Sequence, residues 1–275
     1  MHMARIALFL PLLSFVACGG PLPAAPESNV APPVVAVPPQ PVASSASTTT
    51  VLPPRVPDDQ ARSDADVALD PGRHPIETIE FFGIKPGQHV AELGSGSGYT
   101  TELLARAVGP SGVVYGQNPK WLLEKFAEKP WSERLAKPVM KNVTRLDREF
   151  DDPFPPEVKD LDAVVSILFY HDTVWLQADR DKMNRAAFAA LKHGGIYGII
   201  DHSGQPGSGI RDVKTFHRID EAFLTAEVEK AGFKLQDKAN FLRNPDDKRD
   251  WNDAPNAAAE KRGTSDRFVL KFVKP

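Results

Sequence analysis

A three-layer α/β sandwich on a mostly parallel sheet, of Rossmann-like type, is the fold class that this sequence predicts. Three observations lead to it. The stretch 161–169, LDAVVSILF, is continuously apolar after its aspartate, as a central parallel strand is. Short apolar stretches alternate with helix-spaced ones from about residue 75 to the end of the chain. The stretch 88–108, QHVAELGSGSGYTTELLARAV, joins a strand to a helix through glycines at alternate positions.

Length and composition fit one folded domain preceded by an extension. A chain of 275 residues with 41% hydrophobic residues can bury one sizeable core. Fifteen of the 26 prolines lie in the first third, a density that is incompatible with packed helices and strands. The net charge of −3 argues against electrostatic capture of nucleic acid. We therefore expect a domain at 61–275 and no nucleic-acid partner.

Residues 1–18 are predicted to be a signal peptide of the lipoprotein type. Arg5 precedes an apolar run from Ile6 to Ala17, which is too short for a permanent transmembrane helix. The segment FVACGG that follows resembles a bacterial lipobox, with Phe15 where leucine is usual. Cys18 is the only cysteine, so it is either a lipid-modified residue or an ordinary thiol, and disulfides are excluded. We expect membrane attachment through a lipid at Cys18.

Residues 19–60 are predicted to be a disordered spacer rich in proline, alanine and serine. The segment lacks apolar periodicity of either the strand or the helix type. Such a composition cannot bury enough surface to offset its ordering entropy. The predicted location is the bacterial cell envelope, facing the periplasm or exterior, or the cytoplasm if the leader is not processed.

The elements of the folded part follow in order. Pro75 is suited to a first helical position, and the apolar spacing after it predicts a helix ending at Gly83. The run after Asp181 predicts an amphipathic helix closed by the turn Lys192-His193-Gly194-Gly195. The predicted helices are 75–82, 121–126, 181–191 and 216–231, with one more after the glycine-rich turn. The predicted strands are 89–93, 112–117, 142–146, 161–169, 196–200, 233–239 and 267–273.

The glycine-rich turn is predicted to bind a ligand. A side chain at Gly94, Gly96 or Gly98 would block both the positive φ of a sharp turn and close approach to the backbone. A tight turn without a ligand would also favour glycine. Glu92 completes the pattern E-x-G-x-G-x-G, which resembles motif I of the class I S-adenosylmethionine-dependent methyltransferases. The dinucleotide pattern G-x-G-x-x-G fits less well, because Gly98 comes one residue early.

The resemblance extends over residues from about 70 to 275. GVVYGQNP, LDAVVSILFYHD and LKHGGIYGIID resemble further motifs of the family in the same order. The chain most closely resembles a group of predicted bacterial methyltransferases of unassigned substrate. Like them, it has Y-H-D after the fourth strand and R-N-P…W-N-D near its end. The resemblance implies a sandwich of the class I methyltransferase type, S-adenosylmethionine as cofactor and methyl transfer to a small or lipid-like acceptor. The implied cofactor-binding residues are Glu92, Gly94, Ser95, Gly96, Gly98, Gln117, Asn118, Asp147 and Tyr170.

The sequence departs from the family at two places. Gln117 and Asn118 stand where an acidic residue usually accepts hydrogen bonds from the ribose hydroxyls. An amide can accept one bond and donate another, so we expect weakened but retained binding. His193 replaces the usual proline of the L-K-P-G-G turn, and no catalytic role is assigned to it.

Two histidines are the candidates for catalysis. The carboxyl ends of parallel strands meet on the face that carries the glycines. His171 follows the fourth strand and His202 the fifth, so both are predicted to lie there. Methyl transfer is a displacement in which positioning supplies most of the catalysis, and a base is needed only when the acceptor loses a proton. We favour His171 as that base over His202; alternatively, His171 binds the cofactor or caps a helix.

No metal site is predicted. A site of His171, Asp172, His202 and His217 is conceivable, but these residues lack the i, i+4 spacing of a helical zinc site. His217 and Asp220 are expected on one face of a helix start. The stretch 204–212 is either a plain loop or a cover over the substrate, and R-N-P…W-N-D lies in a long polar loop of the functional or mobile kind.

Two functions of different class follow. The first is the methyl transfer that the resemblance implies. The alternative is a catalytically silent, envelope-anchored binding module on the same fold, because a protein outside the cytosol would meet little S-adenosylmethionine. The retained Glu92 and glycines favour the enzyme. The sequence identifies neither the acceptor nor the oligomeric state.

Overall fold

The computed structural model describes residues 62–275. The predicted signal peptide with Cys18 and the predicted spacer lie outside the described residues. Within 62–275, none of the helices is both long enough and apolar enough to cross a bilayer.

A seven-stranded sheet forms the centre of the described part, with strand order β3-β2-β1-β4-β5-β7-β6. Strands β1 to β5 run parallel, whereas β7 is antiparallel to both β5 and β6. After β3 the chain crosses to the other half of the sheet and enters β4, so β1 and β4 are neighbours at the point where the strand order reverses. The strands are β1 (His89–Leu93), β2 (Val113–Asn118), β3 (Val143–Asp147), β4 (Leu161–Ile167), β5 (Leu191–His202), β6 (Lys234–Ala239) and β7 (Arg267–Val273).

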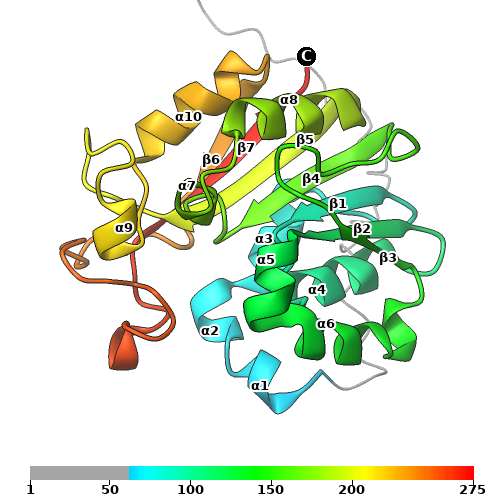
Figure 1. The fold of residues 1–275 in the computed structure, drawn as a ribbon, viewed down its shortest axis with the longest axis horizontal. Helices are drawn as coiled ribbons and strands as arrows, with labels where there is room; N and C mark the ends of the chain where they lie inside the picture. The colour runs from blue at the N-terminus through cyan, green and yellow to red at the C-terminus, as the bar shows by residue number, and fades with distance from the viewer. Residues whose placement is uncertain (1–61) are drawn as a thin grey trace, which may run out of the picture. The chain divides into compact units, whose positions relative to one another are not determined.

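Helices cover both faces of the sheet, which confirms the predicted three-layer α/β sandwich (Figure 1). Alternate side chains of each strand enter two cores: Ala91 packs in the one and its neighbour Val90 in the other. The helices are α1 (Asp64–Val67), α2 (Asp70–Arg73), α3 (Pro75–Phe82), α4 (Tyr99–Val108), α5 (Lys120–Leu122), α6 (Glu128–Leu135), α7 (Asp172–Trp175), α8 (Arg180–Ala190), α9 (Val213–Phe216) and α10 (Glu221–Lys230). A π-helical turn, Leu123–Ala127, joins α5 to α6, and 3-10 turns form at Pro138–Met140 and Ala259–Lys261.

Helix 75–82 and strands 89–93 and 267–273 agree with their predicted bounds. Strand β4 is shorter than predicted. It ends at Ile167 because Leu168 has a φ of 55°, which turns the chain out of the sheet toward His171.

Two predictions at β5 and α10 are wrong. Residues 192–195 do not close a helix: α8 ends at Ala190, and these residues form an irregularity at the start of β5, between the pairs Leu191–Leu161 and Ile196–Ala163. The predicted helix 216–231 is interrupted at His217, whose φ is 59°. Helix α10 begins only at Glu221 with Asp220 as its N-cap, so His217 and Asp220 do not share a helix face.

Candidate active site

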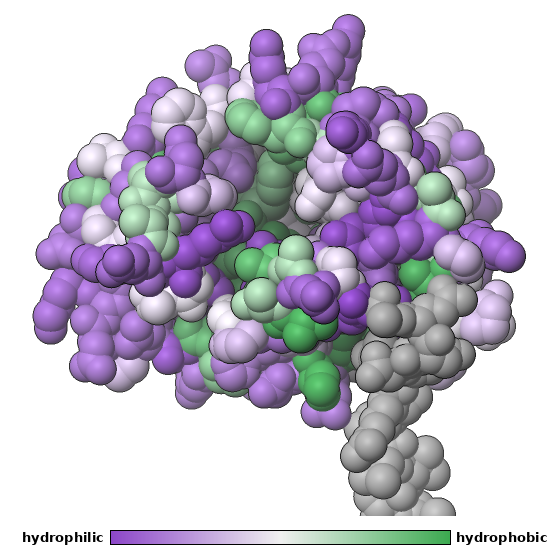
Figure 2. Space-filling view, turned by 90° about the horizontal axis from the view of Figure 1, so that it is seen from below, coloured by the Kyte–Doolittle hydropathy of each residue, from purple (hydrophilic) through white to green (hydrophobic). Residues whose placement is uncertain are grey.

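A cavity of about 1150 Å³ opens at the carboxyl ends of β1 and β4. Open parallel sheets bind their ligands at such a reversal of strand order. Its walls come from the glycine-rich turn, the α1–α2 segment, the residues after β4, and the loop between β6 and β7. Figure 2 shows a hollow in the lower face of the domain with hydrophobic residues at its edge. The predicted site residues that line the cavity are Glu92, Gly94, Ser95, Gly96 and His202.

The three glycines of the turn have different roles, although all have positive φ. A Cβ at Gly94 would lie 2.4 Å from the ring of Phe169, and one at Gly98 would lie 2.4 Å from the ring of Trp131. A Cβ at Gly96 would meet nothing within 4 Å. Gly94 and Gly98 therefore permit packing of the protein on itself, whereas Gly96 presents bare backbone to the open space of the cavity.

Glu92 lies at the end of β1 and is only 2% exposed. The Thr101 hydroxyl of α4 donates a hydrogen bond to its carboxylate. Burial disfavours the charged form and raises the pKa of Glu92 to about 7, against the opposing effect of this hydrogen bond. A buried carboxyl group that titrates near neutrality thus lies beside the glycine-rich turn.

The segment 62–74 forms a wall of the cavity that the sequence analysis missed. Asp66 in α1 forms a two-bonded ion pair with Arg134 of α6 at 2.8 Å, and Arg134 also donates to the Ser97 carbonyl of the glycine-rich turn. The guanidinium of Arg73 lies 4.5 Å from the Tyr99 ring centre and forms no ion pair with any carboxylate of residues 62–275. This short, charged stretch has no apolar periodicity, so its position in the cavity wall could not be predicted from the sequence.

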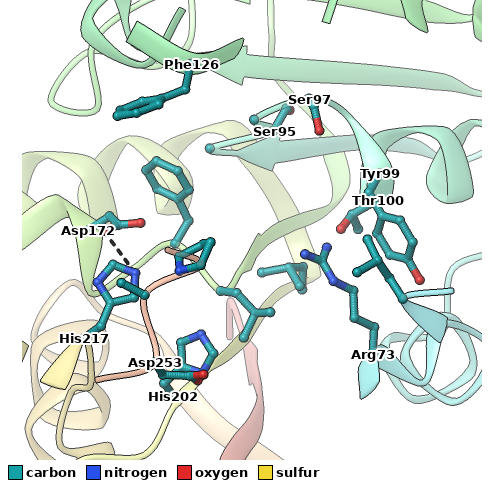
Figure 3. A pocket seen from close by; sticks show the side chains of 18 of the residues that line it. Arg73, Ser95, Ser97, Tyr99, Thr100, Phe126, Asp172, His202, His217 and Asp253 are labelled. Atoms are coloured by element: carbon teal, nitrogen blue, oxygen red, sulfur yellow. Dashed lines mark ion pairs between the residues drawn. The ribbon is translucent and has the colours of Figure 1, made fainter. Parts of the chain in front are cut away.

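Three histidines converge at the opposite end of the cavity. Ring centres lie 4.1 Å apart for His171 and His217 and 5.4 Å apart for His171 and His202. Figure 3 shows His202 and His217 across the cavity from Arg73 and Thr100. His202 and His217 line the cavity, whereas His171 is fully buried behind them. The strand ends bring His171 and His202 together as predicted.

His202 is paired with a residue from the loop between β6 and β7. Its Nδ1 is in close ion-pair contact with Oδ2 of Asp253, and the Ser265 hydroxyl lies 2.9 Å from the same nitrogen. We assign the Nδ1 proton to the bond with Asp253, which leaves a lone pair on Nε2. Burial lowers the pKa of His202 to about 4, although the Asp253 carboxylate opposes the shift. His202 is therefore neutral at pH 7.

His171 has a different environment. Its Nδ1 lies 2.6 Å from Asp201 Oδ1, and its backbone N–H donates to the other oxygen of Asp201 at 2.8 Å. Burial opposes the charged ring, but the negative charges of Asp201 and Asp172 outweigh it and raise the pKa of His171 to about 9. Full burial and this protonation disfavour His171 as the base.

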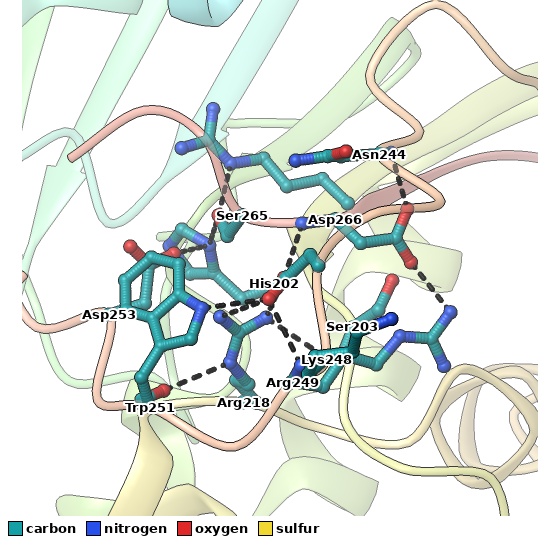
Figure 4. A network of polar contacts seen from close by, with 12 residues as sticks. His202, Ser203, Arg218, Asn244, Lys248, Arg249, Trp251, Asp253, Ser265 and Asp266 are labelled. Atoms are coloured by element: carbon teal, nitrogen blue, oxygen red, sulfur yellow. Dashed lines mark hydrogen bonds and ion pairs between the residues drawn. The ribbon is translucent and has the colours of Figure 1, made fainter. Parts of the chain in front are cut away.

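The path of the β6–β7 loop is held by a buried network (Figure 4). Arg218, fully buried, pairs with Asp247 at 2.8 Å and lies 4.6 Å from the Trp251 ring centre. Asp247 also accepts hydrogen bonds from the Trp251 indole and from the Asp266 backbone, both at 2.7 Å. The W-N-D motif therefore has two roles. Trp251 holds the loop in position, and the carboxylate of Asp253 contacts His202.

Comparison with known proteins agrees with this geometry. Residues 74–143 match the family model of protein-L-isoaspartate (D-aspartate) O-methyltransferase. The chain is 30% identical over 145 residues to the ubiquinone/menaquinone biosynthesis C-methyltransferase UbiE of Vibrio parahaemolyticus, covering 51% of this chain and 52% of that protein. It is 30% identical over 129 residues to protein-L-isoaspartate O-methyltransferase of Ignicoccus hospitalis, with 47% and 54% covered. The chain thus spans about half the length of the curated relatives it matches.

Solved structures share the fold. A SAM-dependent methyltransferase from Aquifex aeolicus superposes with a TM-score of 0.54 at 19% identity, covering 77% of this chain and 97% of that one. The chain therefore has the fold of the class I S-adenosylmethionine-dependent methyltransferases. The [4+2]-cyclase SpnF has the same fold with a TM-score of 0.53 at 18% identity, covering 74% of this chain and 81% of that one. The fold alone therefore does not specify methyl transfer.

The side-chain amides of the last two residues of β2 have partners that the superfamily pattern does not predict. Gln117 accepts a hydrogen bond from the Gly94 N–H at 3.0 Å. Asn118 accepts from the Gly96 N–H at 2.8 Å and donates to the Gly96 carbonyl at 3.0 Å. Both amides are fully buried and neither lines the cavity. They fix the backbone of the glycine-rich turn, so their predicted contact with the ribose is not part of this arrangement.

Three other predicted residues also lie off the cavity wall. Gly98 caps α4. Asp147 ends β3 and pairs with Arg145 at 2.7 Å. Tyr170 is buried, where its hydroxyl accepts a hydrogen bond from Asn184 at 2.8 Å. Gly98 therefore shapes the glycine-rich turn without lining the cavity. Asp147 and Tyr170 contact neighbouring elements of the protein.

Proposed function

We propose that this protein transfers a methyl group from S-adenosylmethionine to a small or lipid-like acceptor. The observation that carries the proposal is the shared cavity of the Glu92–Gly98 turn and the His202–Asp253 pair. The first feature is the superfamily's cofactor motif, and the second is a neutral imidazole held by a carboxylate. A ligand-binding turn and a proton acceptor thus face one space.

The cavity residues fit the cofactor. Bare backbone at Gly96 allows a ligand to approach closely. Glu92, ionised above its pKa of about 7, suits the cationic groups of S-adenosylmethionine. Arg73, without a carboxylate partner among the described residues, suits the carboxylate of its methionine part. Since Gln117 and Asn118 are occupied by the turn, binding rests more heavily on these contacts.

We assign the role of base to His202 rather than His171. In the displacement, a bond forms between the acceptor atom and the methyl carbon, the carbon–sulfur bond breaks, and the acceptor's proton passes to Nε2 of His202. Asp253 orients the ring through Nδ1 and stabilises the imidazolium that results. S-adenosylhomocysteine is the other product.

The mouth of the cavity supports an apolar acceptor. Trp121, Phe126 and Trp175 line the cavity and are 46%, 68% and 49% exposed. Large exposed aromatic side chains around an opening are typical of sites that receive apolar ligands. The UbiE relatives are named as C-methyltransferases of ubiquinone/menaquinone biosynthesis, which agrees with a lipid-like acceptor.

Titration calorimetry of the full-length protein with S-adenosylmethionine and S-adenosylhomocysteine tests the proposal. Saturable binding of either compound supports it, and radiolabelled methyl transfer to extracted lipids and small phenols then identifies the acceptor class. Absence of both heat and thermal stabilisation at millimolar concentration would exclude the cofactor. Binding of cofactor without transfer would favour the alternative, a silent binding module, which the predicted envelope location supports.

A further inference from the structure

Two histidines and a carboxylate meet beside the His202–Asp253 pair. His171, Asp172 and His217 each place one ligand atom within 4.8 Å of the other two. Asp172 Oδ1 lies 3.5 Å from Nε2 of His171 and 3.7 Å from Nε2 of His217. Figure 3 shows Asp172 directed toward His217 at one end of the cavity.

The Nε2 atom of His171 lacks a hydrogen-bond partner within residues 62–275, although it is fully buried. Buried polar atoms in folded proteins nearly always have a partner, so such an atom calls for an explanation. Its 3.5 Å separation from Asp172 is long for a hydrogen bond. Two ligands of one four-coordinate zinc ion, with bonds of about 2.0–2.1 Å, lie about 3.3 Å apart. The observed spacing is close to that value.

Asp201 supports this reading of His171. Its carboxylate accepts hydrogen bonds from Nδ1 of His171 at 2.6 Å and from the backbone N–H groups of His171 and His202 at 2.8 and 2.7 Å. A carboxylate that holds the Nδ1 proton leaves Nε2 as the ring nitrogen that can bind a metal, which displaces the proton from it. Such carboxylate–histidine pairs accompany most histidine ligands of metals.

The backbone of His217 adds an independent observation. This residue has a φ of 59°, and its N–H caps α9 by bonding the Val213 carbonyl at 3.0 Å. Residues held in the left-handed region cluster at functional sites. In this conformation Nε2 of His217 lies 3.7 Å from Oδ1 of Asp172.

We propose that Nε2 of His171, the imidazole of His217 and the carboxylate of Asp172 bind a divalent transition-metal ion, with zinc as the probe. Two nitrogen ligands and one oxygen ligand suit such an ion. Asp172 and His217 line the cavity, so the remaining coordination position faces it and takes water or an oxygen atom of the acceptor. His202 is not part of the ligand set, because only His171, Asp172 and His217 have ligand atoms that all lie within 4.8 Å of one another among residues 62–275.

Zinc binding is measured independently of methyl transfer. A protein that binds no zinc would overturn the metal site but not the proposed methyl transfer, and the reverse also holds. The full-length protein, stripped with chelator, is titrated with zinc chloride, and bound metal is counted by mass spectrometry. We expect one zinc per chain. Cobalt(II) in place of zinc should give the visible bands of a low-symmetry, four- or five-coordinate ion.

His217→Ala and Asp172→Asn should each weaken zinc binding at least a hundredfold, and Asp201→Asn by about 10–100-fold. The control His193→Ala removes an exposed histidine and should leave affinity unchanged. Circular dichroism and thermal melts establish that each variant is folded, and His217→Asp, which supplies an oxygen ligand, should restore part of the affinity. The proposal is overturned if wild type binds no zinc, or if folded His217→Ala and Asp172→Asn keep wild-type affinity.

Discussion

Asp253 is in ion-pair contact with Nδ1 of His202, although the two residues come from separate parts of the chain: His202 ends β5, and Asp253 lies in the loop between β6 and β7. The pair places an oriented imidazole on the cavity wall that also holds the glycine-rich turn. The assignment of His202 as base depends on this relationship.

The first prediction tests that pair. His202→Ala should lower turnover about 10²–10⁴-fold, because the acceptor's proton loses its acceptor. Cofactor affinity should stay within a few-fold, since His202 lies across the cavity from Arg73 (Figure 3). His193→Ala is the matched control and should leave turnover unchanged.

Asp253→Asn should act through the same step, so the double variant should be no slower than His202→Ala alone. Additive losses would contradict the pairing, and loss of turnover in His171→Ala alone would return the role of base to His171.

The second prediction concerns the bare backbone at Gly96. Gly96→Val should abolish binding of S-adenosylmethionine while the strands remain visible by circular dichroism, because the new side chain occupies ligand space. Gly194→Val is the matched control. Gly194 also has positive φ and open space around it, but does not line the cavity. Both variants carry backbone strain of about 1–2 kcal/mol. Equal loss of binding in the two would assign the effect to strain.

The third prediction is a pH dependence of folding stability caused by Glu92. Its pKa rises from 4.5 to about 7 on folding, so the folded state holds a proton that the unfolded state releases between these values. The stability contribution is fully present below pH 4.5 and is lost as pH rises through 7. The shift corresponds to about 3 kcal/mol. Urea unfolding at pH 4.5 and 8 should show wild type losing about this much relative to Glu92→Gln. If the difference in unfolding free energy between wild type and Glu92→Gln is the same at both pH values, the raised pKa of Glu92 is contradicted.

Glu92→Ala also tests the cofactor contact. It should weaken binding of S-adenosylmethionine by about 1.5–3 kcal/mol, the magnitude of a hydrogen bond to a charged group. Calorimetry at pH 8, where Glu92 is ionised, measures it. Glu77→Ala removes an exposed carboxylate in α3 and should leave affinity unchanged. Unchanged affinity in Glu92→Ala would remove this residue from the cofactor site.

The fourth prediction concerns the anchor of the β6–β7 loop. Arg218→Ala leaves the buried Asp247 carboxylate without its partner and should destabilise the fold by about 3–5 kcal/mol. Hydrogen exchange should quicken in residues 240–266, and turnover should fall because Asp253 is released from His202. Lys129→Ala, which removes an exposed ion pair with Glu133, should change stability by less than about 0.5 kcal/mol. Unchanged exchange in Arg218→Ala would show that other contacts hold the loop.

The last prediction concerns location. We propose that the full-length chain is lipid-anchored through Cys18, so metabolic labelling with a fatty acid should mark wild type and leave Cys18→Ala unlabelled. A wild-type chain that takes up no label would make Cys18 an ordinary thiol and favour the cytoplasmic location.

Local sequence alone determined the sheet's central strands and the glycine-rich turn. The run 161–169 is apolar because both faces of β4 are buried, and Gly94, Gly96 and Gly98 are required by the backbone itself. Such constraints act between neighbours in the chain, so they can be read from the sequence.

The tertiary structure alone decided which polar residues meet. Gln117 and Asn118 stand where ribose contacts are expected, yet their amides satisfy the backbone of the turn. His217 was placed on a helix face, but it terminates α9 and faces Asp172. Asp253 reaches His202 because the buried Arg218–Asp247 pair fixes a loop without periodicity. Contacts between residues far apart in the chain depend on how the elements pack. The sequence pattern of one element does not specify which other elements it contacts.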